Sequence, residues 1–558
     1  MSGRLYPHLL TPLSLRGVLF ENRVLAAPMG AARAMDGGRL SPEGVDSYES
    51  RARGGFAQVT VDEPGLELTG ADPRLEVLVE ALRGRDVVAA LRLSRPADAA
   101  QTALAARAAG FQALWLREEP GTDAAALCAE IRASTSGRVL LQLEVQVGED
   151  DLLTEARING LRELEPQLDL LVVKPVVRPC PGLDEVEQGL ALVGAVKEQL
   201  RLPVAALVEL SDPGQGERAI AAGRCDFIAL GHQQLADPDF VRKAALGRGG
   251  EIIPSLHALC PAPTGYSAAN PWTGRELRWR QAPRPGGKRR VMVVGGGPAG
   301  LSAAVTAAGR GHDVILVERC ANVGGLLWQG EADPNTAPLV RLREALKEQC
   351  RRLGVKFQLS TDATREYVAR MAPDAIVCAT GSASTPLRLE GGETHHVLYA
   401  YDNPHHIGHR VVIVGGGPAG CQGAMYLADR GHPVTLLERE GELLPRARAE
   451  LRERLLARLT PYTEGWNGQG GRERITVRLG AIPTALAGDS LVWQSEDGES
   501  HTLMADTVLY AVGRQREDSV AVQLRDLAPF FRCVGDCRGP GDVAKALFEG
   551  AQAALDIL

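Results

Sequence analysis

The chain has 558 residues, of which 45% are hydrophobic and 23% are charged, and its formal net charge is −7. This length exceeds what one hydrophobic core organises, and it predicts about three or four domains. The acidic balance argues against a nucleic acid partner, and the lack of a basic face or of about 18 consecutive apolar residues argues against a membrane.

The first residues lack the apolar core of a signal peptide. Ten cysteines are scattered along the chain without any C-x-x-C pair. These features predict a cytoplasmic protein without a disulfide framework, and no residue pattern predicts a metal site.

Residues 1–250 alternate short apolar runs with helical stretches that are rich in Ala, Leu and Arg. Each run lies about one helix length from the next, which is typical of βα units in a parallel sheet. The number of units predicts an α/β fold that begins with a closed (β/α)8 barrel. The runs are residues 87–91, 113–116, 139–143, 168–173, 202–207 and 227–230.

Residues 251–287 contain much proline and glycine and little periodicity, so we expect a connector there. The connector ends in residues 282–287 (APRPGG), which predict a domain boundary just before Lys288.

An internal repeat follows. Residues 291–300 (VMVVGGGPAG) and 411–420 (VVIVGGGPAG) each have the pattern of a strand, a glycine-rich turn and the start of a helix. In each copy a glutamate, Glu318 or Glu438, ends the next strand 23 residues after the first glycine. One glycine motif is weak evidence, but two copies in this context predict two Rossmann-like dinucleotide-binding domains.

The glycines of the first copy have distinct physical roles. Gly295 allows the tight turn, Gly297 lets the backbone approach a pyrophosphate at the helix N-terminus, and Gly300 lets the helix pack against the strand. Glu318 is expected to accept hydrogen bonds from an adenosine ribose. In the second copy Glu438 also disfavours a 2′-phosphate, which favours NADH over NADPH, although the neighbouring Arg439 weakens that argument.

Later residues complete the two predicted sites. Turns at Thr380–Gly381 and at Gly513 return the chain past each nucleotide, and Asp536 is placed to bond the ribityl chain of FAD or, alternatively, to be a plain helix N-cap. The expected FAD contacts are Gly295, Gly297, Ala299, Gly300, Glu318, Arg319, Gly325, Leu326, Thr380, Gly381, Gly535 and Asp536. The expected NAD contacts are Gly415, Gly417, Gly420, Glu438, Arg439 and Gly513.

This half of the chain resembles flavoproteins with two dinucleotide-binding domains. The resemblance implies an FAD-binding domain formed by residues 288–385 and 505–558, with an NAD(H)-binding domain, residues 386–504, inserted between them.

The whole chain resembles the family of trimethylamine dehydrogenase and 2,4-dienoyl-CoA reductase. That family joins an FMN barrel like that of old yellow enzyme to a [4Fe-4S] segment and then to two such domains. The resemblance lies in residues 9–15 (LLTPLSL), 22–29 (NRVLAAPM), 36–41 (DGGRLS), 48–55 (YESRARGG), 225–231 (CDFIALG) and 235–240 (LADPDF).

The chain departs from the family at the iron–sulfur segment. Aligned on residues 270–276 (NPWTGRE), the four ligand positions hold Ser255, Ala258, Ala262 and Ser267, and the nearby Cys260 is out of register. A [4Fe-4S] cluster needs four thiolates or close substitutes, so we expect none.

The FMN site departs as well. The family's flavin-contacting glutamine corresponds to Ala90, and the family's strand-end histidines are absent from residues 109–117. The phosphate-binding glycine of the seventh strand is replaced around Val208. The Gly-Arg pair that follows the eighth strand in the family is Gly231–His232 here. We therefore expect no FMN and a barrel that is a retained scaffold, with surface or packing roles for Arg92, Arg117 and His232.

The resulting hypothesis is an FAD-dependent oxidoreductase that takes hydride from NADH and passes electrons to a partner protein, a quinone-like molecule or oxygen. No residue stands out as a catalytic acid or base. One alternative is an FMN/FAD ene-reductase or amine dehydrogenase with a diverged barrel. Another is a non-catalytic nucleotide-binding subunit paired with an intact homologue; an oligomer is expected, since barrels of this family often associate.

Overall fold

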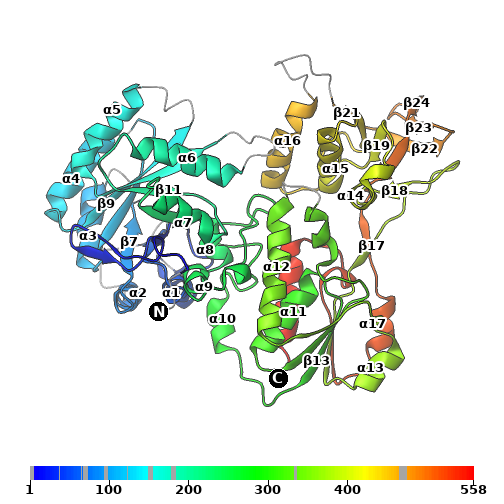
Figure 1. Ribbon diagram of the computed structural model, residues 1–558, viewed down its shortest axis with the longest axis horizontal. Coiled ribbons are helices and arrows are strands. Elements are labelled where there is room, and N and C mark those ends of the chain that lie inside the picture. The colour runs from blue at the N-terminus through cyan, green and yellow to red at the C-terminus, as the bar shows by residue number, and fades with distance from the viewer. Residues whose placement is uncertain are drawn as a thin grey trace. The chain divides into compact units, whose positions relative to one another are not determined.

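The computed structural model describes residues 5–36, 38–63, 66, 73–93, 98–121, 123–148, 155–177, 184–331, 336–463 and 474–558 (Figure 1). Residues 1–4, Gly37 and Cys180, which entered the sequence interpretation, lie outside these ranges. The chain divides into two compact units, one formed mainly by residues 1–258 and 262–284 and the other mainly by residues 285–343 and 350–558. None of the described helices is both long enough and apolar enough to cross a bilayer.

The first unit is a closed barrel of eight parallel strands, as the alternation of apolar runs and helices predicted. Every strand pairs in parallel with its two neighbours, and the helices that follow the strands cover the outside (Figure 1). The strands are β3 (Val24–Ala26), β6 (Gln58–Val61), β7 (Val88–Arg92), β8 (Ala113–Arg117), β9 (Leu140–Gly148), β10 (Leu170–Val176), β11 (Val204–Leu207) and β12 (Phe227–Leu230). The helices are α1 (Pro42–Arg53), α2 (Pro73–Arg83), α3 (Ala99–Ala108), α4 (Ala124–Thr135), α5 (Glu155–Leu164), α6 (Glu185–Lys197), α7 (Pro213–Ala221), α8 (His232–Ala236) and α9 (Phe240–Ala245).

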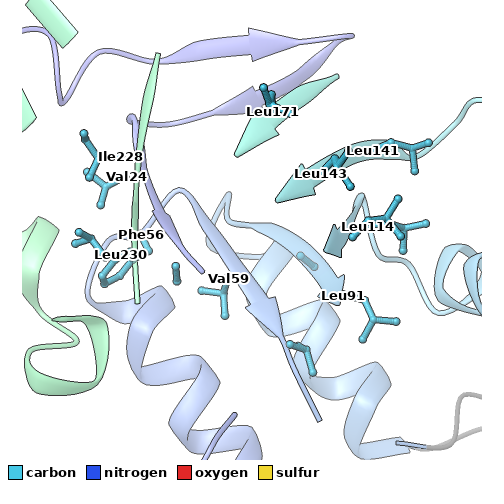
Figure 2. Packing of buried hydrophobic residues seen from close by; sticks show 14 of the residues in the cluster. Val24, Phe56, Val59, Leu91, Leu114, Leu141, Leu143, Leu171, Ile228 and Leu230 are labelled. Atoms are coloured by element: carbon cyan, nitrogen blue, oxygen red, sulfur yellow. The ribbon is translucent and has the colours of Figure 1, made fainter. Parts of the chain in front are cut away.

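Side chains alternate along the barrel strands between two cores. One core lies between strands and helices and includes Val24, Val59 and Leu91 (Figure 2). The other fills the barrel and includes the fully buried Trp115 and Phe227. The barrel is therefore a packed scaffold and not a channel.

The connector packs on the barrel. The Asn270 side-chain amide donates to the Leu235 carbonyl oxygen at 2.9 Å, and a Cβ at Gly265 would lie 2.4 Å from the Ala32 nitrogen. The segment includes one short helix, α10 (Glu276–Gln281), and two small hairpins precede it, β1 (Leu13–Leu15) with β2 (Val18–Phe20) and β4 (Met35–Asp36) with β5 (Arg39–Leu40).

The second unit contains two five-stranded parallel sheets, each built on one copy of the glycine repeat. The first has the order β15 (Lys356–Gln358), β14 (Asp313–Val317), β13 (Arg290–Val294), β16 (Ala375–Cys378) and β27 (Phe530–Cys533). Its helices are α11 (Pro298–Gly309), α12 (Ala337–Arg352), α13 (Arg365–Met371), α17 (Ser519–Leu524) and α18 (Val543–Leu555).

The second sheet has the order β18 (His395–His396), β25 (Thr507–Tyr510), β19 (Val411–Val414), β20 (Val434–Leu437) and β21 (Ile475–Arg478). Its helices are α14 (Tyr399–Asp402), α15 (Pro418–Asp429) and α16 (Ala449–Thr463), and an antiparallel sheet of β22 (Ile482–Leu486), β23 (Ser490–Gln494) and β24 (Ser500–Met504) accompanies it. Strands β17 (Ser382–Ser384) and β26 (Arg514–Arg516) pair where the chain passes between the two sheets.

Strand β25 belongs to the second sheet, although residue 505 was the expected point at which the chain returns to the first domain. Residues 507–510 pair with β18 and β19 of the second sheet, so the chain returns to the first sheet only after Tyr510. Strand β27 then completes the first sheet beside β16, so the two sheets are interleaved along the chain.

Candidate functional site

The first glycine turn joins β13 to α11 and has no room for side chains at two positions. Gly295 has φ of +101°, and a Cβ there would lie 2.3 Å from the Ala379 carbonyl oxygen. A Cβ at Gly300 would lie 1.9 Å from the Gly295 carbonyl oxygen. Both glycines are therefore required by the turn itself, whether or not a nucleotide binds.

Gly297 differs from its neighbours because a Cβ there would meet nothing within 4 Å. It is the N-cap of α11, its φ of −73° suits any residue, and no side chain caps the helix. The first N–H groups of α11, at the positive end of the helix, thus have no side-chain cap, and there is open space at Gly297. This is the geometry that a pyrophosphate requires.

Glu318 lies at the end of β14 and fixes the turn. Its Oε2 accepts from the Gly296 nitrogen at 2.6 Å, and its Oε1 accepts from the Cys320 nitrogen at 2.9 Å. A carboxylate oxygen can accept more than one hydrogen bond, so both oxygens keep capacity for ribose hydroxyls.

The second copy repeats this geometry. Gly415 has φ of +110°, a Cβ at Gly420 would lie 1.8 Å from the Gly415 carbonyl oxygen, and Gly417 again has nothing within 4 Å at an uncapped helix N-terminus. The backbone bonds correspond as well, since the Gly295 and Gly415 nitrogens both donate at 2.8 Å to the strand that ends in the glutamate. The repeat in sequence is therefore a repeat in structure.

Glu438 is buried at the end of β20. Its Oε2 accepts from the Gly416 nitrogen at 2.5 Å and its Oε1 from the Glu440 nitrogen at 2.9 Å. The Arg439 side chain is 66% exposed, and its guanidinium pairs with Glu440 at 3.2 Å. A negative charge thus lies beside the second turn, and the nearest arginine in sequence is already paired.

The other predicted FAD residues surround the first turn unevenly. The Asp536 carboxylate accepts from the Ser382 hydroxyl at 2.7 Å and from the Gly541 nitrogen at 3.1 Å, so it does not act as a plain cap of α18, whose N-cap is Asp542. Gly325 packs against Gly297, because a Cβ placed on Gly325 would lie 3.1 Å from the Gly297 Cα. Among the remaining predicted contacts, Ala299 is buried and packs on α18, and the Thr380 hydroxyl donates to the Glu517 carbonyl oxygen. Gly381 and Gly535 have positive φ. Arg319 and Leu326 are exposed, and a Cβ at Gly513 would meet nothing within 4 Å.

The barrel end that binds phosphate in related folds is capped by the protein itself. In such barrels phosphate binds at the loops after the seventh and eighth strands, at the N-terminus of a short helix. Here that helix is α8, and Glu209, which follows the seventh strand β11, accepts from the His232 nitrogen at 2.8 Å and from the Gln233 nitrogen at 3.1 Å. A carboxylate therefore occupies the N–H groups that a phosphate would need, and the sequence interpretation did not identify Glu209.

Three basic side chains near the ends of barrel strands are paired with carboxylates. Arg92 bonds Asp62 at 2.9 Å, and Arg117 bonds Glu144 at 3.0 Å. His232 lies 3.1 Å from Glu209 and stacks on the His257 ring at 3.5 Å. Surface or packing roles for the three residues stay a prediction.

The connector does not hold the donor set of an iron–sulfur cluster. Throughout residues 251–287, all of which are described, the only cysteine is Cys260. The two serines at former ligand positions bond the chain locally, since Ser267 accepts from the Ala269 nitrogen and the Ser255 nitrogen donates to Gln233. The residues present therefore do not fit a [4Fe-4S] cluster.

Three cysteines that the sequence interpretation treated as scattered come together in the second unit. The sulfur atoms of Cys378, Cys533 and Cys537 all lie within 4.8 Å of one another. Only the spacing of Cys533 and Cys537 is visible in the sequence; the third member is brought in by the pairing of β16 with β27.

Comparison with known proteins agrees with this architecture. Residues 289–527 match the model of the family described as pyridine nucleotide-disulphide oxidoreductase. The chain is 30% identical over 396 residues to an NADH oxidase of Thermoanaerobacter brockii, which is 66% of this chain and 58% of that protein. It is 28% identical over 370 residues to a bilirubin reductase of Mediterraneibacter gnavus, or 64% of this chain and 56% of that one. The chain thus covers less than two thirds of the length of these relatives.

A solved structure extends the likeness to the whole chain. The 2-naphthoyl-CoA reductase in complex with 2-naphthoyl-CoA has a TM-score of 0.86 at 21% identity and covers 99% of this chain and 100% of its own. The expected resemblance to the family of trimethylamine dehydrogenase and 2,4-dienoyl-CoA reductase is confirmed, and so is the fold class.

Proposed function

We propose that this chain, which has the family's barrel and both of its dinucleotide-binding folds, is an FAD-dependent oxidoreductase. In this proposal it oxidises NADH and passes the electrons to an acceptor outside the chain, and the barrel has no catalytic role. The observation that carries the proposal is the pair of uncapped helix N-termini at Gly297 and Gly417, each beside a glutamate that ends the next strand.

The first copy is the proposed FAD site. The N–H groups of α11 would hold the pyrophosphate, Glu318 the adenosine ribose, and Asp536, which Ser382 and the Gly541 nitrogen orient, the ribityl chain. When bound, FAD supplies hydride acceptance and electron transfer, while the chain supplies position and electrostatics. The domain would comprise residues 288–385 and the segment after Tyr510.

The second copy is the proposed NADH site. The N–H groups of α15 would hold the pyrophosphate, and Glu438 would accept from the ribose hydroxyls. A 2′-phosphate would meet the Glu438 carboxylate, and the adjacent Arg439 is paired with Glu440. This arrangement favours NADH over NADPH, and the likeness to an NADH oxidase supports the same choice.

The barrel is proposed to lack FMN. The Glu209 carboxylate at α8 and the ion pairs of Arg92 and Arg117 leave no uncompensated positive charge among these groups for a phosphate. With neither an FMN site nor a cluster in the connector, electrons would have no internal route into the barrel. The acceptor would then be a partner protein, a homologous subunit, a quinone-like molecule or oxygen.

An anaerobic titration with NADH tests the proposal. The flavin absorbance band of the purified chain should bleach as NADH is added, and NADPH should be much less effective. A chain that contains FAD but whose band does not respond to NADH would contradict the proposed electron donor. A chain that contains ADP in place of FAD would favour a non-catalytic subunit instead.

A further inference from the structure

The cysteine cluster is formed by three elements of the first sheet. Cys378 ends β16, Cys533 ends β27, and Cys537 closes the short turn, Gly535–Cys537, that follows β27. Cys378 and Cys533 are direct partners in the parallel ladder, so their side chains lie on the same face of the sheet. The turn then brings Cys537 back to that face, and the three sulfur atoms lie within 4.8 Å of one another.

The cluster is largely buried, and one of its three cysteines is partly exposed to solvent. Cys378 and Cys537 are buried, and Cys533 is half-buried. Within the described parts of the chain, it is the only set of three His, Cys, Asp or Glu side chains whose ligand atoms meet in this way. Buried cysteines elsewhere, such as Cys128 and Cys350, are in no such group, and burial raises the pKa of their thiols to about 11 and about 12.

We propose that Cys378, Cys533 and Cys537 bind a soft, thiophilic metal ion through three sulfur ligands, with Cu(I) as the best match. Zn²⁺ takes four ligands in its structural sites, and no imidazole or carboxylate joins the three sulfurs among the described residues. Thiolate ligands alone select soft ions, and Cu(I) is the softest of the common first-row candidates.

Binding exchanges protons for the metal and leaves its oxidation state unchanged. The Cys537 sulfur lies 3.1 Å from the Cys378 carbonyl oxygen and 3.2 Å from the Val534 carbonyl oxygen, either of which can accept its one proton. Each thiol that ligates the ion releases its proton to solvent, so the apparent affinity for Cu(I) should rise with pH. The site lies next to Asp536, so a bound ion would also stiffen the turn that positions this carboxylate.

The test uses the reduced 558-residue chain together with the nucleotides that it carries when isolated. Cu(I) is added under anaerobic conditions, and a chromogenic Cu(I) chelator competes with the protein for it. We expect one tightly bound Cu(I) per chain, a sulfur-to-copper charge-transfer band in the ultraviolet, and sulfur-only coordination by X-ray absorption. Cys533→Ser should weaken Cu(I) binding by about 100-fold or more, because it removes one of three ligands.

Cys320→Ser is the matched control, since Cys320 is exposed and belongs to no group of ligands. Cys320→Ser should leave the affinity for Cu(I) unchanged. Without added metal, both variants should unfold at the same temperature as the wild-type chain. Equal Cu(I) affinity in Cys533→Ser, tighter binding of Zn²⁺ than of Cu(I), or a disulfide between two of the three cysteines in the isolated chain would overturn the proposal. None of these outcomes depends on whether NADH reduces the flavin, so the two proposals can fail separately.

Discussion

At the scale of single residues, glycines within one turn differ in what they require. Gly295 and Gly300 are enclosed by backbone atoms, so any side chain there disrupts the turn. Gly297 and Gly417 have negative φ and open space, so a methyl group there is compatible with the fold and intrudes only on a bound pyrophosphate. The two open glycines therefore allow each proposed site to be tested without unfolding the protein.

Gly297→Ala should lower the affinity for FAD by about 10-fold or more, through steric conflict with the pyrophosphate. Gly417→Ala should leave the flavin content intact and raise the KM for NADH by a similar factor. Flavin content after dialysis and steady-state NADH oxidation measure the two effects. Loss of flavin in the Gly417→Ala variant, or none in Gly297→Ala, would mean that the sites are assigned to the wrong copies.

Glu438 is expected to choose between the two nicotinamide nucleotides. Glu438→Gln removes the negative charge and should weaken the charge-assisted bonds to the ribose, so that the KM for NADH rises about 10-fold. The KM for NADPH should fall or stay the same, because repulsion of a 2′-phosphate is relieved. Glu499→Gln, which removes an exposed carboxylate just before β24, is the control, and equal effects of Glu438→Gln on both nucleotides would argue against this role.

At the scale of elements, helices α11 and α8 differ in whether a side chain bonds the N–H groups of the first turn. No side chain caps α11, whereas Glu209 occupies the N–H groups of α8. Glu209→Ala should therefore lower the free energy of unfolding of the barrel by about 1 kcal/mol, the usual cost of losing an N-cap.

Chemical denaturation measures this loss, and Glu209→Gln should recover most of it because an acceptor is restored. NADH oxidation and FAD content should be unchanged in both variants. A drop in either would show that the barrel end takes part in catalysis and would contradict the scaffold role.

Strand β18 carries a histidine whose charge state is coupled to folding. Burial, together with the nearby Arg514 charge, lowers the pKa of His396 from 6.5 to about 4, and the Leu398 nitrogen donates to its Nδ1 at 3.4 Å, which suits the neutral ring. Between pH 6.5 and 4, His396 is protonated in the unfolded chain but stays mostly neutral in the folded chain. Stability from this group is therefore complete above pH 6.5 and is lost as the pH falls toward 4.

His396→Gln should remove this part of the pH dependence. Because the ring is only half-buried, we expect a difference of about 1 kcal/mol between wild type and variant to develop between pH 6.5 and 4. Unfolding curves at several pH values measure it, and parallel profiles for the two proteins would show that His396 is protonated equally in both states.

The elements also show how far a sequence can predict this molecule. The glycine turns and the barrel strands were predictable, because their signals are local: spacing within one motif, and apolar runs one helix apart. Glu209 at α8 and the meeting of Cys378 with Cys533 were not, because each depends on which distant segments pair in space. The limit at residue 505 was early for a related reason, since the sequence alone does not tell which sheet strand β25 joins.

At the scale of the whole molecule, the chain keeps the family's architecture, and its connector, residues 251–287, contains one cysteine. The barrel interior is filled with side chains, and Arg92 and Arg117 are paired with carboxylates, which is compatible with the proposed scaffold role. In the proposed function, FAD is the only redox nucleotide that the chain binds permanently.

The most direct test is the identity and stoichiometry of the cofactors released when the purified protein is denatured, by mass spectrometry and absorbance, together with an iron assay. The account predicts FAD equimolar with the chain, without FMN or iron. Release of FMN and FAD in equal amounts would contradict it and would return catalysis to the barrel.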